Sequence, residues 1–444
     1  MKLRVLACAF ACDPEGQSGH GAGEDQLGWN LINQLSRRHE LWVLSHPDNR
    51  GGVERALSKR PNPALHFHYL RLPSWLEFLS KHHKGGIQIY SYLWQMAAYF
   101  AARSLHGQFR YDAFHHVTYA NDWMASFIGA CLRIPFVRGP GGGADRTPRA
   151  FLKEYCFGDR LWERFRSLGQ WVLRQDPFFR IGQRRTRAIL VCNREALERV
   201  PERYRTKANL FPVVGVSSDD LPPAARAEQA RATFRVVSAG KLLYWKGFAL
   251  AIRAFKVFLE GAGATGVGRK PELAIVGNGP ELPRLQELVR TLGLEGNVRF
   301  DGWLSHDEVL ARMRSCDVLL YASLRDGGGA VVVEALATGL PVVCLDLGGP
   351  GIHVTDDCGI KVPARSPEEA VRDLAAGLSR LYGDKERRDR MGKNARERGE
   401  RVYDWDRLGE RLLRIYEEAL GPEIMGLEAG TMGEARARLR AHAE

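Results

Sequence analysis

The chain of 444 residues has no uninterrupted apolar run of about 18 residues or more, the length that a membrane-spanning helix needs. Its opening apolar segment, Leu3 to Phe10, is too short for a secretory signal and has no clean cleavage site, so we expect no leader. The eight cysteines include no C-x2-C pair, which argues against a disulfide framework or a zinc site and predicts reduced, mostly buried thiols in the cytoplasm. With 45% apolar and 26% charged residues, the bulk of the chain is neither disordered nor collagen-like nor a coiled coil.

Excess positive charge is missing from the second half of the chain. Residues 1–218 contain 31 Lys and Arg against 18 Asp and Glu, a net charge of +13, whereas the remainder contains 33 against 34, a net charge of −1. This asymmetry points to an anionic partner for the N-terminal half, such as a membrane surface, an acidic acceptor or nucleic acid; a solvated basic surface is the alternative. No nucleic-acid-binding motif accompanies the charge, so we expect no nucleic acid.

Short apolar strands alternate with helical stretches in two series. The first series begins with Leu3 to Phe10, and the second begins after a Pro- and Ala-rich linker with Phe234 to Ser238. Such alternation predicts two Rossmann-like, doubly wound parallel sheets. We expect an N-terminal domain (1–218), a linker (219–231), a C-terminal domain (232–404), and a crossover helix with a tail (405–444) that packs back on the first domain.

Two segments of the first half break this alternation. Ile87 to Ala102 carries no charge and five aromatic residues, and residues 149–187 hold ten Lys and Arg, four acids and eight aromatics. Aromatic residues interleaved with basic ones suit a membrane interface. A core helix followed by a basic surface helix is the alternative.

Candidate ligand-binding loops follow successive strands of the second series. Gly240-Lys241 and Lys246-Gly247 place two cations in one loop, as a diphosphate leaving group would require. Further along, Asp326 and Glu334 stand eight residues apart around Gly327, Gly328 and Gly329. Glycines let backbone N–H groups approach an anion at a helix N-terminus, and the two carboxylates can accept from sugar hydroxyls. An acid in the first turns of a helix is also favourable without any ligand.

The order of these motifs, with Ile275-Val276-Gly277-Asn278-Gly279-Pro280 between them, resembles the donor-binding domain of retaining GT-B glycosyltransferases of family four. In the first half, the segment from Gly19 to Gly28 and Phe136-Val137-Arg138-Gly139-Pro140 are similar to motifs of one branch of that family. The resemblance covers about residues 1–420 and implies a GT-B fold with two domains facing a cleft, an N-terminal acceptor-binding domain (1–218) and a C-terminal nucleotide-sugar-binding domain (232–404). It also implies a metal-independent transfer of sugar from a nucleotide-diphosphate donor.

The resemblance also assigns the site, position by position. It implies catalytic roles for Lys241, Lys246, Asp326 and Glu334 and no metal ligands. It implies donor contacts from Gly21, Ala22, Gly23, Gly240, Lys241, Lys246, Gly277, Gly279, Gly302, Trp303, Leu304, Asp326, Gly327, Gly328, Gly329 and Glu334. On the acceptor side it implies Tyr119, Asn121, Asp122 and Arg138. His115 and His116 precede this group, and we interpret them as core histidines in preference to catalytic ones.

We therefore expect a retaining glycosyltransferase without a cofactor, using a nucleotide-sugar donor and a glycan or lipid-linked acceptor in cell-surface polysaccharide or glycoconjugate biosynthesis. We expect it in the cytoplasm, peripheral on the inner face of the plasma membrane through an anionic surface. A non-catalytic GT-B scaffold is the alternative, because Asp326 stands where the family has Glu and Gly328 where it has Phe. A nicotinamide-dependent dehydrogenase is excluded because no G-x-G-x-x-G follows the first strand.

Overall fold

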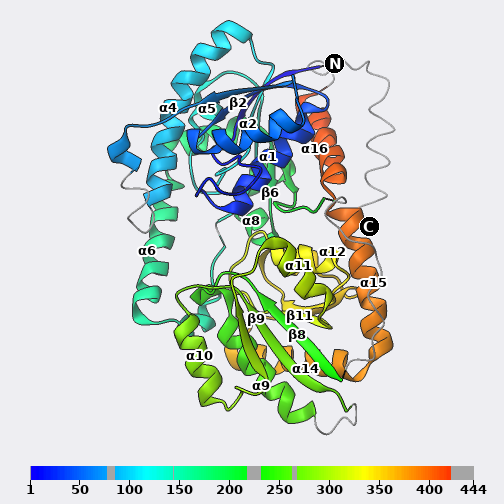
Figure 1. Cartoon of the computed structure of the whole chain (residues 1–444). Helices are drawn as coiled ribbons and strands as arrows, with labels where there is room; N and C mark the ends of the chain where they lie inside the picture. The colour runs from blue at the N-terminus through cyan, green and yellow to red at the C-terminus, as the bar shows by residue number, and fades with distance from the viewer. Residues whose placement is uncertain (1, 78–85, 144, 218–231, 263–267, 422–444) are drawn as a thin grey trace.

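The computed structural model describes residues 2–77, 86–143, 145–217, 232–262 and 268–421. Two parallel sheets lie one above the other in the view of Figure 1, with helices around each. The seven-stranded sheet has the order β3-β2-β1-β4-β5-β6-β7 and the six-stranded sheet the order β10-β9-β8-β11-β12-β13. The prediction of a GT-B fold with two doubly wound parallel sheets is confirmed.

The first sheet is built from strands that are short and mostly buried. They are β1 (Arg4–Cys8), β2 (Glu40–Ser45), β3 (Leu65–Tyr69), β4 (Ala113–His116), β5 (Phe136–Gly141), β6 (Thr186–Val191) and β7 (Ala208–Leu210). Its helical elements are α1 (Ala22–Ser36), η1 (Pro47–Asn49), α2 (Arg50–Lys59), α4 (Gly86–Phe109), α5 (Phe127–Cys131), η2 (Arg149–Glu154), α6 (Phe157–Leu173), α7 (Pro177–Arg185), α8 (Arg194–Arg199) and η3 (Glu202–Lys207). Along β1, Val5 and Ala7 join one apolar cluster and Leu6 and Cys8 join another, so helices cover both faces.

The second sheet repeats this arrangement. Its strands are β8 (Thr233–Ala239), β9 (Lys270–Val276), β10 (Val298–Gly302), β11 (Val318–Tyr321), β12 (Val342–Leu345) and β13 (Gly359–Val362). Its helical elements are η5 (Tyr244–Lys246), α9 (Phe248–Ala262), α10 (Leu282–Thr291), α11 (His306–Arg314), α12 (Ala330–Ala337), α13 (Gly348–His353), α14 (Pro367–Gly383) and α15 (Lys385–Val402). A last helix, α16 (Trp405–Leu420), follows them in the chain. One face packs against α9, α10 and α14 and the other against α11, α12 and α15.

The chain passes between the halves at two places that lie side by side. The N–H of Val216 donates to the carbonyl of Tyr403 (2.8 Å), and the N–H of Trp405 donates to the carbonyl of Val216 (3.1 Å). Beyond this junction α16 returns to the first half, where it packs against α1 (Figure 1). The expected linker, 219–231, and most of the tail after residue 420 lie outside the described residues.

Every predicted strand is present, and the structure adds three that were not predicted. These are β3, β7 and β13, short strands that each lie at a sheet edge. No helix among the described residues is long and apolar enough to cross a membrane. The eight cysteines are free thiols and six of them are buried.

Candidate active site

Three loops at the carboxyl ends of β8, β9 and β10 are tied together by their backbones. The N–H of Leu242 donates to the carbonyl of Asn278 (2.9 Å), and the N–H of Gly277 donates to the carbonyl of Gly302 (2.7 Å). A Cβ at Gly277 would lie 2.0 Å from the carbonyl oxygen of Gly240, and one at Gly279 would lie 2.4 Å from that of Leu242. Both glycines are therefore required by close backbone contact, whether or not they also touch a donor.

Lys246 and Asp326, predicted from separate motifs, form one ion pair. Lys246 Nζ lies 2.6 Å from Asp326 Oδ2 and 3.2 Å from the hydroxyl of Tyr321, which itself hydrogen-bonds the same carboxylate. The other oxygen of Asp326 accepts the N–H of Gly329 (2.9 Å) at the start of α12. Burial acts to raise the pKa of Asp326, but the ammonium and the donated hydrogen bonds outweigh it and hold the pKa below its usual value.

Glu334 lies in the same region on α12. Its side chain is one-fifth exposed, and its carboxylate lies 3.7 Å from Nδ1 of His306 at the start of α11. Burial raises the pKa of Glu334, while the nearby His306 acts to lower it. Lys241 follows β8 and is exposed. Trp303 follows β10 and is 75% exposed, whereas Leu304 packs against the core of the second sheet.

The glycine turn between Asp326 and α12 touches the first half of the chain. A Cβ at Gly327 would lie 2.8 Å from Oδ2 of Asp145, and one at Gly328 would lie 2.9 Å from a methyl carbon of Val213. Asp145 in turn accepts from the amide of Asn193 (2.7 Å). The glycine turn therefore lies against loops that follow β5, β6 and β7.

The neighbouring Arg325 is held by a helix of the first half. Its guanidinium pairs with Glu163 of α6, whose carboxylate also accepts from the hydroxyl of Tyr244 (2.9 Å). The guanidinium stacks on the ring of Trp245, 4.4 Å from its centroid. Glu163 is 6% exposed, so this junction is buried. Neither Glu163 nor Asp145 stands in a recognisable motif, so neither residue could be predicted from the sequence.

The glycine-rich loop before α1 has the open geometry that the resemblance implies. Gly21 is the N-cap of α1 with φ +107°, and neither Gly21 nor Gly23 would meet another atom within 4 Å if it carried a Cβ. Ala22 is the first residue of the helix. The loop is held by a buried acid that no motif predicts: Asp25 accepts from the hydroxyl of Ser18 (2.6 Å), and burial raises the pKa of Asp25 to about 6.

The residues predicted on the acceptor side cluster after β4 and on β5. Arg138 donates to the carbonyl of Asn121 (2.6 Å) and pairs with Asp122 (3.3 Å), and both charged side chains are about 5% exposed. Burial raises the pKa of Asp122 to about 7, although Arg138 opposes the shift. Tyr119, with φ +54°, donates its hydroxyl to the carbonyl of His20 (2.7 Å), which joins this cluster to the loop before α1. The buried pair fixes the loop, and contact with an acceptor stays a prediction.

His115 and His116 are core residues. His115 lies between the carbonyl of Gly139 (2.6 Å) and the hydroxyl of Tyr416 on α16 (2.7 Å), and burial lowers its pKa to about 4. His116 lies 3.1 Å from the amide of Gln95 and is also buried, which lowers its pKa to about 3. Both histidines are neutral at pH 7.

Comparisons with known proteins agree with this fold and these loops. Residues 225–398 match the family of glycosyl transferases group 1. An uncharacterized glycosyltransferase of Methanocaldococcus jannaschii is 26% identical over 334 residues, covering 71% of this chain and 77% of that protein. The structure of sucrose-phosphate synthase from Thermosynechococcus elongatus is 17% identical with a TM-score of 0.60, covering 94% of this chain and 99% of that one. An Anabaena HepE structure in complex with UDP and glucose is 16% identical with a TM-score of 0.57, covering 93% and 99%.

The two parallel sheets and the similarity to these solved structures thus show a GT-B fold. Residues 225–398 match the group 1 glycosyltransferases, and this match supports a catalytic role in sugar transfer.

Proposed function

We propose that the protein transfers a sugar from a nucleotide-diphosphate donor to a membrane-proximal glycan or lipid-linked acceptor, with retention of configuration and without a metal at the diphosphate. The observation that carries the proposal is the Lys246–Asp326 ion pair beside the N-terminus of α12. It supplies a cation for the diphosphate and a carboxylate for sugar hydroxyls at the carboxyl ends of β8 and β11. The HepE complex with UDP and glucose is consistent with such a donor.

In the proposed step, the bond between the anomeric carbon and the diphosphate oxygen breaks, and the diphosphate leaves with the electron pair. The acceptor hydroxyl forms the new bond on the same face and passes its proton to the departing phosphate oxygen. The protein contributes orientation and stabilisation of the negative charge that develops on the diphosphate. Lys246, exposed Lys241 and the N–H groups before α12 are placed to provide that stabilisation.

The test incubates the whole chain with a panel of nucleotide sugars and measures nucleoside-diphosphate release, with and without added magnesium or manganese. We expect release from one donor at the same rate in both conditions, and NMR of the product should show the anomeric configuration of the donor. Tight donor binding by calorimetry without any release, across a range of glycan and lipid-linked acceptors, would favour the non-catalytic scaffold. Inverted product, or release that requires magnesium or manganese, would contradict the mechanism.

A row of exposed apolar side chains supports a membrane-proximal acceptor. On α6 they are Phe157, Leu161, Phe165, Leu168 and Val172, at spacings of three and four residues that place them on one face. Phe157 is 76% exposed, whereas Glu163 and Gln170 on the opposite face are buried against the protein. The usual pattern of a surface helix is thus reversed.

Further apolar side chains are exposed on α4, whose Tyr92 packs against the same small buried cluster as Leu173 at the end of α6. Ile89, Met96 and Phe100 are exposed on α4, and the hydroxyl of Tyr92 on the same helix bonds to Asp176 at the start of α7 (2.6 Å). We call the exposed apolar residues of α4 and α6 the apolar row. Exposed arginines flank it, among them Arg160, Arg164, Arg180 and Arg184. Apolar insertion flanked by positive charge fits an anionic membrane, where each basic residue contributes about 1 kcal/mol. Free thiols fit the cytoplasmic face of that membrane.

Co-sedimentation with vesicles tests this surface. We expect binding to vesicles with anionic lipid at low salt, and loss of binding at high salt or with neutral lipid. Phe165→Glu should abolish sedimentation, because it places a charge in the middle of the row. Lys393→Ala on α15 is the control, because the Lys393 side chain is 79% exposed and its loss lowers the net charge by only one. This variant should sediment like the parent protein. Equal recovery in the supernatant under all conditions would contradict membrane docking.

A further inference from the structure

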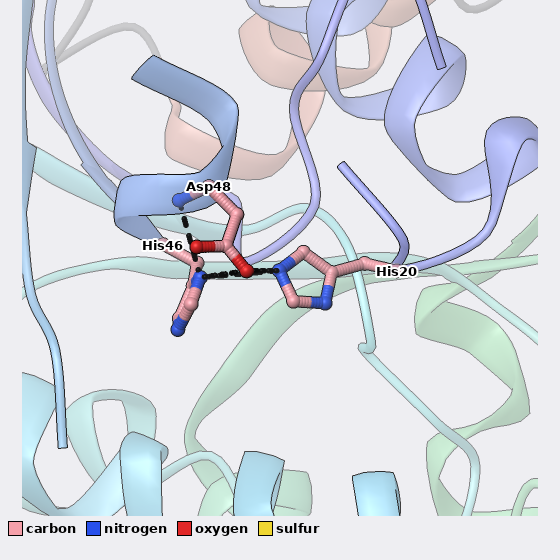
Figure 2. Close-up of side chains that lie close together, drawn as sticks. All are labelled: His20, His46 and Asp48. Carbon is pink, nitrogen blue, oxygen red and sulfur yellow. Dashed lines mark hydrogen bonds and ion pairs between the residues drawn. The ribbon is translucent and has the colours of Figure 1, made fainter. Parts of the chain in front are cut away.

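Two histidines and an aspartate converge where the loops after β1 and β2 meet (Figure 2). His20 belongs to the loop before α1, His46 follows β2, and Asp48 lies in η1. His20 Nε2 lies 3.1 Å from His46 Nδ1 and 3.7 Å from Asp48 Oδ2, and His46 Nδ1 lies 3.4 Å from the same oxygen. The three potential ligand atoms therefore form a triangle with sides of 3.1, 3.4 and 3.7 Å.

We infer that His20, His46 and Asp48 form a binding site for a divalent transition metal, with zinc as the best fit. Zinc bonds of about 2.0–2.1 Å in a tetrahedral arrangement place neighbouring ligand atoms about 3.3 Å apart. The three measured separations, 3.1, 3.4 and 3.7 Å, bracket that value. Both carboxylate–imidazole separations exceed the usual 2.7–3.2 Å of a hydrogen bond. Imidazole and carboxylate are also the donor types that zinc takes.

Surrounding groups orient the three ligands toward the same point. The guanidinium of Arg71 contacts Asp48 Oδ1 (3.1 Å), so Oδ2 is the oxygen that faces the imidazoles. His46 Nε2 lies 3.1 Å from the hydroxyl of Tyr90 and 3.8 Å from Glu77, which suits a ring that carries its proton on Nε2 and binds metal through Nδ1. Such outer partners are typical of metal-bound histidines. The ring of Phe10 packs on both imidazoles, 4.7 Å from that of His20 and 5.3 Å from that of His46.

A competing contact exists at one ligand atom. The N–H of Asp48 lies 3.3 Å from Nδ1 of His46, a long hydrogen bond that metal binding would replace. Without metal, an N–H of one imidazole can occupy the 3.1 Å contact to the other. A hydrogen-bonded cluster is therefore the outcome that the experiment must separate from a metal site.

The metal would tie the loop before α1 to the end of β2. His20 stands next to Gly21, the N-cap of α1, and its carbonyl accepts the hydroxyl of Tyr119. Metal loading would thus fix the glycine loop that opens α1 before any donor binds. This role is separate from the transfer step, which the proposed function runs without a metal at the diphosphate, so the two proposals can fail independently.

The test uses the full chain carrying Cys156→Ser, which removes the exposed thiol. Chelator-treated protein is titrated with zinc by calorimetry, and cobalt is added to a second sample as a spectroscopic probe. We expect a single zinc ion per chain, a rise in melting temperature, and an intense visible cobalt band of tetrahedral type without a thiolate charge-transfer band.

Two variants and a matched control locate the site. His20→Gln and Asp48→Asn each remove a ligand and should weaken zinc binding by at least about 100-fold, since loss of an outer-shell partner alone costs about 10–100-fold. His66→Gln is the control, because His66 also pairs with a carboxylate, Glu40 (3.0 Å), on strands of the same sheet but away from the cluster. It should bind zinc like the parent. Circular dichroism checks that each variant is folded. If a variant is unfolded, the cobalt spectrum of the parent protein tests the metal site instead. Substoichiometric zinc binding by the parent, or parental affinity in both ligand variants, would overturn the assignment.

Discussion

Replacing Asp326 with Asn tests the buried ion pair at the centre of the proposed donor site. The substitution keeps the size of the side chain and one acceptor oxygen, but it removes the negative charge that lies 2.6 Å from Lys246 Nζ. Hydrogen bonds to charged groups contribute about 1.5–3 kcal/mol, so we expect the free energy of unfolding to fall by about that amount at pH 7. Lys246 is only 19% exposed, so solvent compensates little for the lost partner.

The pH dependence gives the prediction its sign. The pKa of Asp326 is lower in the folded protein than its usual value, so its stabilising contribution is complete above the usual Asp range and is lost as pH falls through the folded pKa. The difference between parent and Asp326→Asn should therefore be largest at neutral pH and shrink below about pH 4. Urea unfolding followed by tryptophan fluorescence measures it, and Trp245, stacked on Arg325 next to Asp326, reports locally.

Asp389→Asn is the matched control. Asp389 lies 2.6 Å from Lys385, the same separation as in the buried pair, but on the exposed surface of α15 with side chains 53% and 67% exposed. Exposed pairs four residues apart on a helix contribute only about 0.3–0.5 kcal/mol. If Asp326→Asn cost no more than Asp389→Asn, or if its cost were the same at every pH, the reasoning about the buried pair would be refuted.

Two further predictions concern the donor. Glu334→Gln should weaken nucleotide-sugar binding by about 1.5–3 kcal/mol, because an amide has half the acceptor capacity of a carboxylate; His306→Gln, which alters only a neighbour that is 56% exposed, should change affinity little in the same calorimetric assay. Unchanged affinity in folded Glu334→Gln would remove Glu334 from the site. Lys246→Ala should lower kcat more than it raises KM, because the diphosphate gains negative charge as its bond to the sugar breaks. Steady-state diphosphate release measures both constants, and a rise in KM alone would mean that Lys246 binds donor and transition state equally.

The parts of the fold that the sequence predicts are those with strong local patterns. The strand from Val318 to Tyr321 and the helix from Trp405 to Leu420 are found where the apolar spacing places them. Edge strand β3 is half-buried and contains His66 and His68 between its apolar residues, so its pattern is weak. The second sheet is also less self-contained than its sequence suggests, because Phe151 and Tyr155 from the first half pack in its core.

For the site, motifs predict which loops carry chemistry but not which side chains they meet. Lys246 and Asp326 were expected to contact different parts of a donor, and their mutual pairing depends on the register of β8 beside β11. Glu163 lies in a segment without any glycine-rich or strand-end motif, whereas His20 stands within the glycine-rich loop before α1 and Asp48 follows β2. For all three residues, only the packing of distant segments determines the partners. Spacing along the chain contains no information about such contacts.

The return of α16 to the first half also determines the order in which the protein can finish folding during synthesis. Leu408, Leu412 and Tyr416 belong to the same apolar core as Val5 and Leu31, yet they are among the last described residues to leave the ribosome. The 194 residues between Leu210 and Trp405 require about 10–40 s at about 5–20 residues per second. Throughout that interval the first sheet has an uncovered apolar face that chaperones can bind. The C-terminal sheet, whose core needs no residue after Tyr403, can complete its packing before the N-terminal sheet that precedes it.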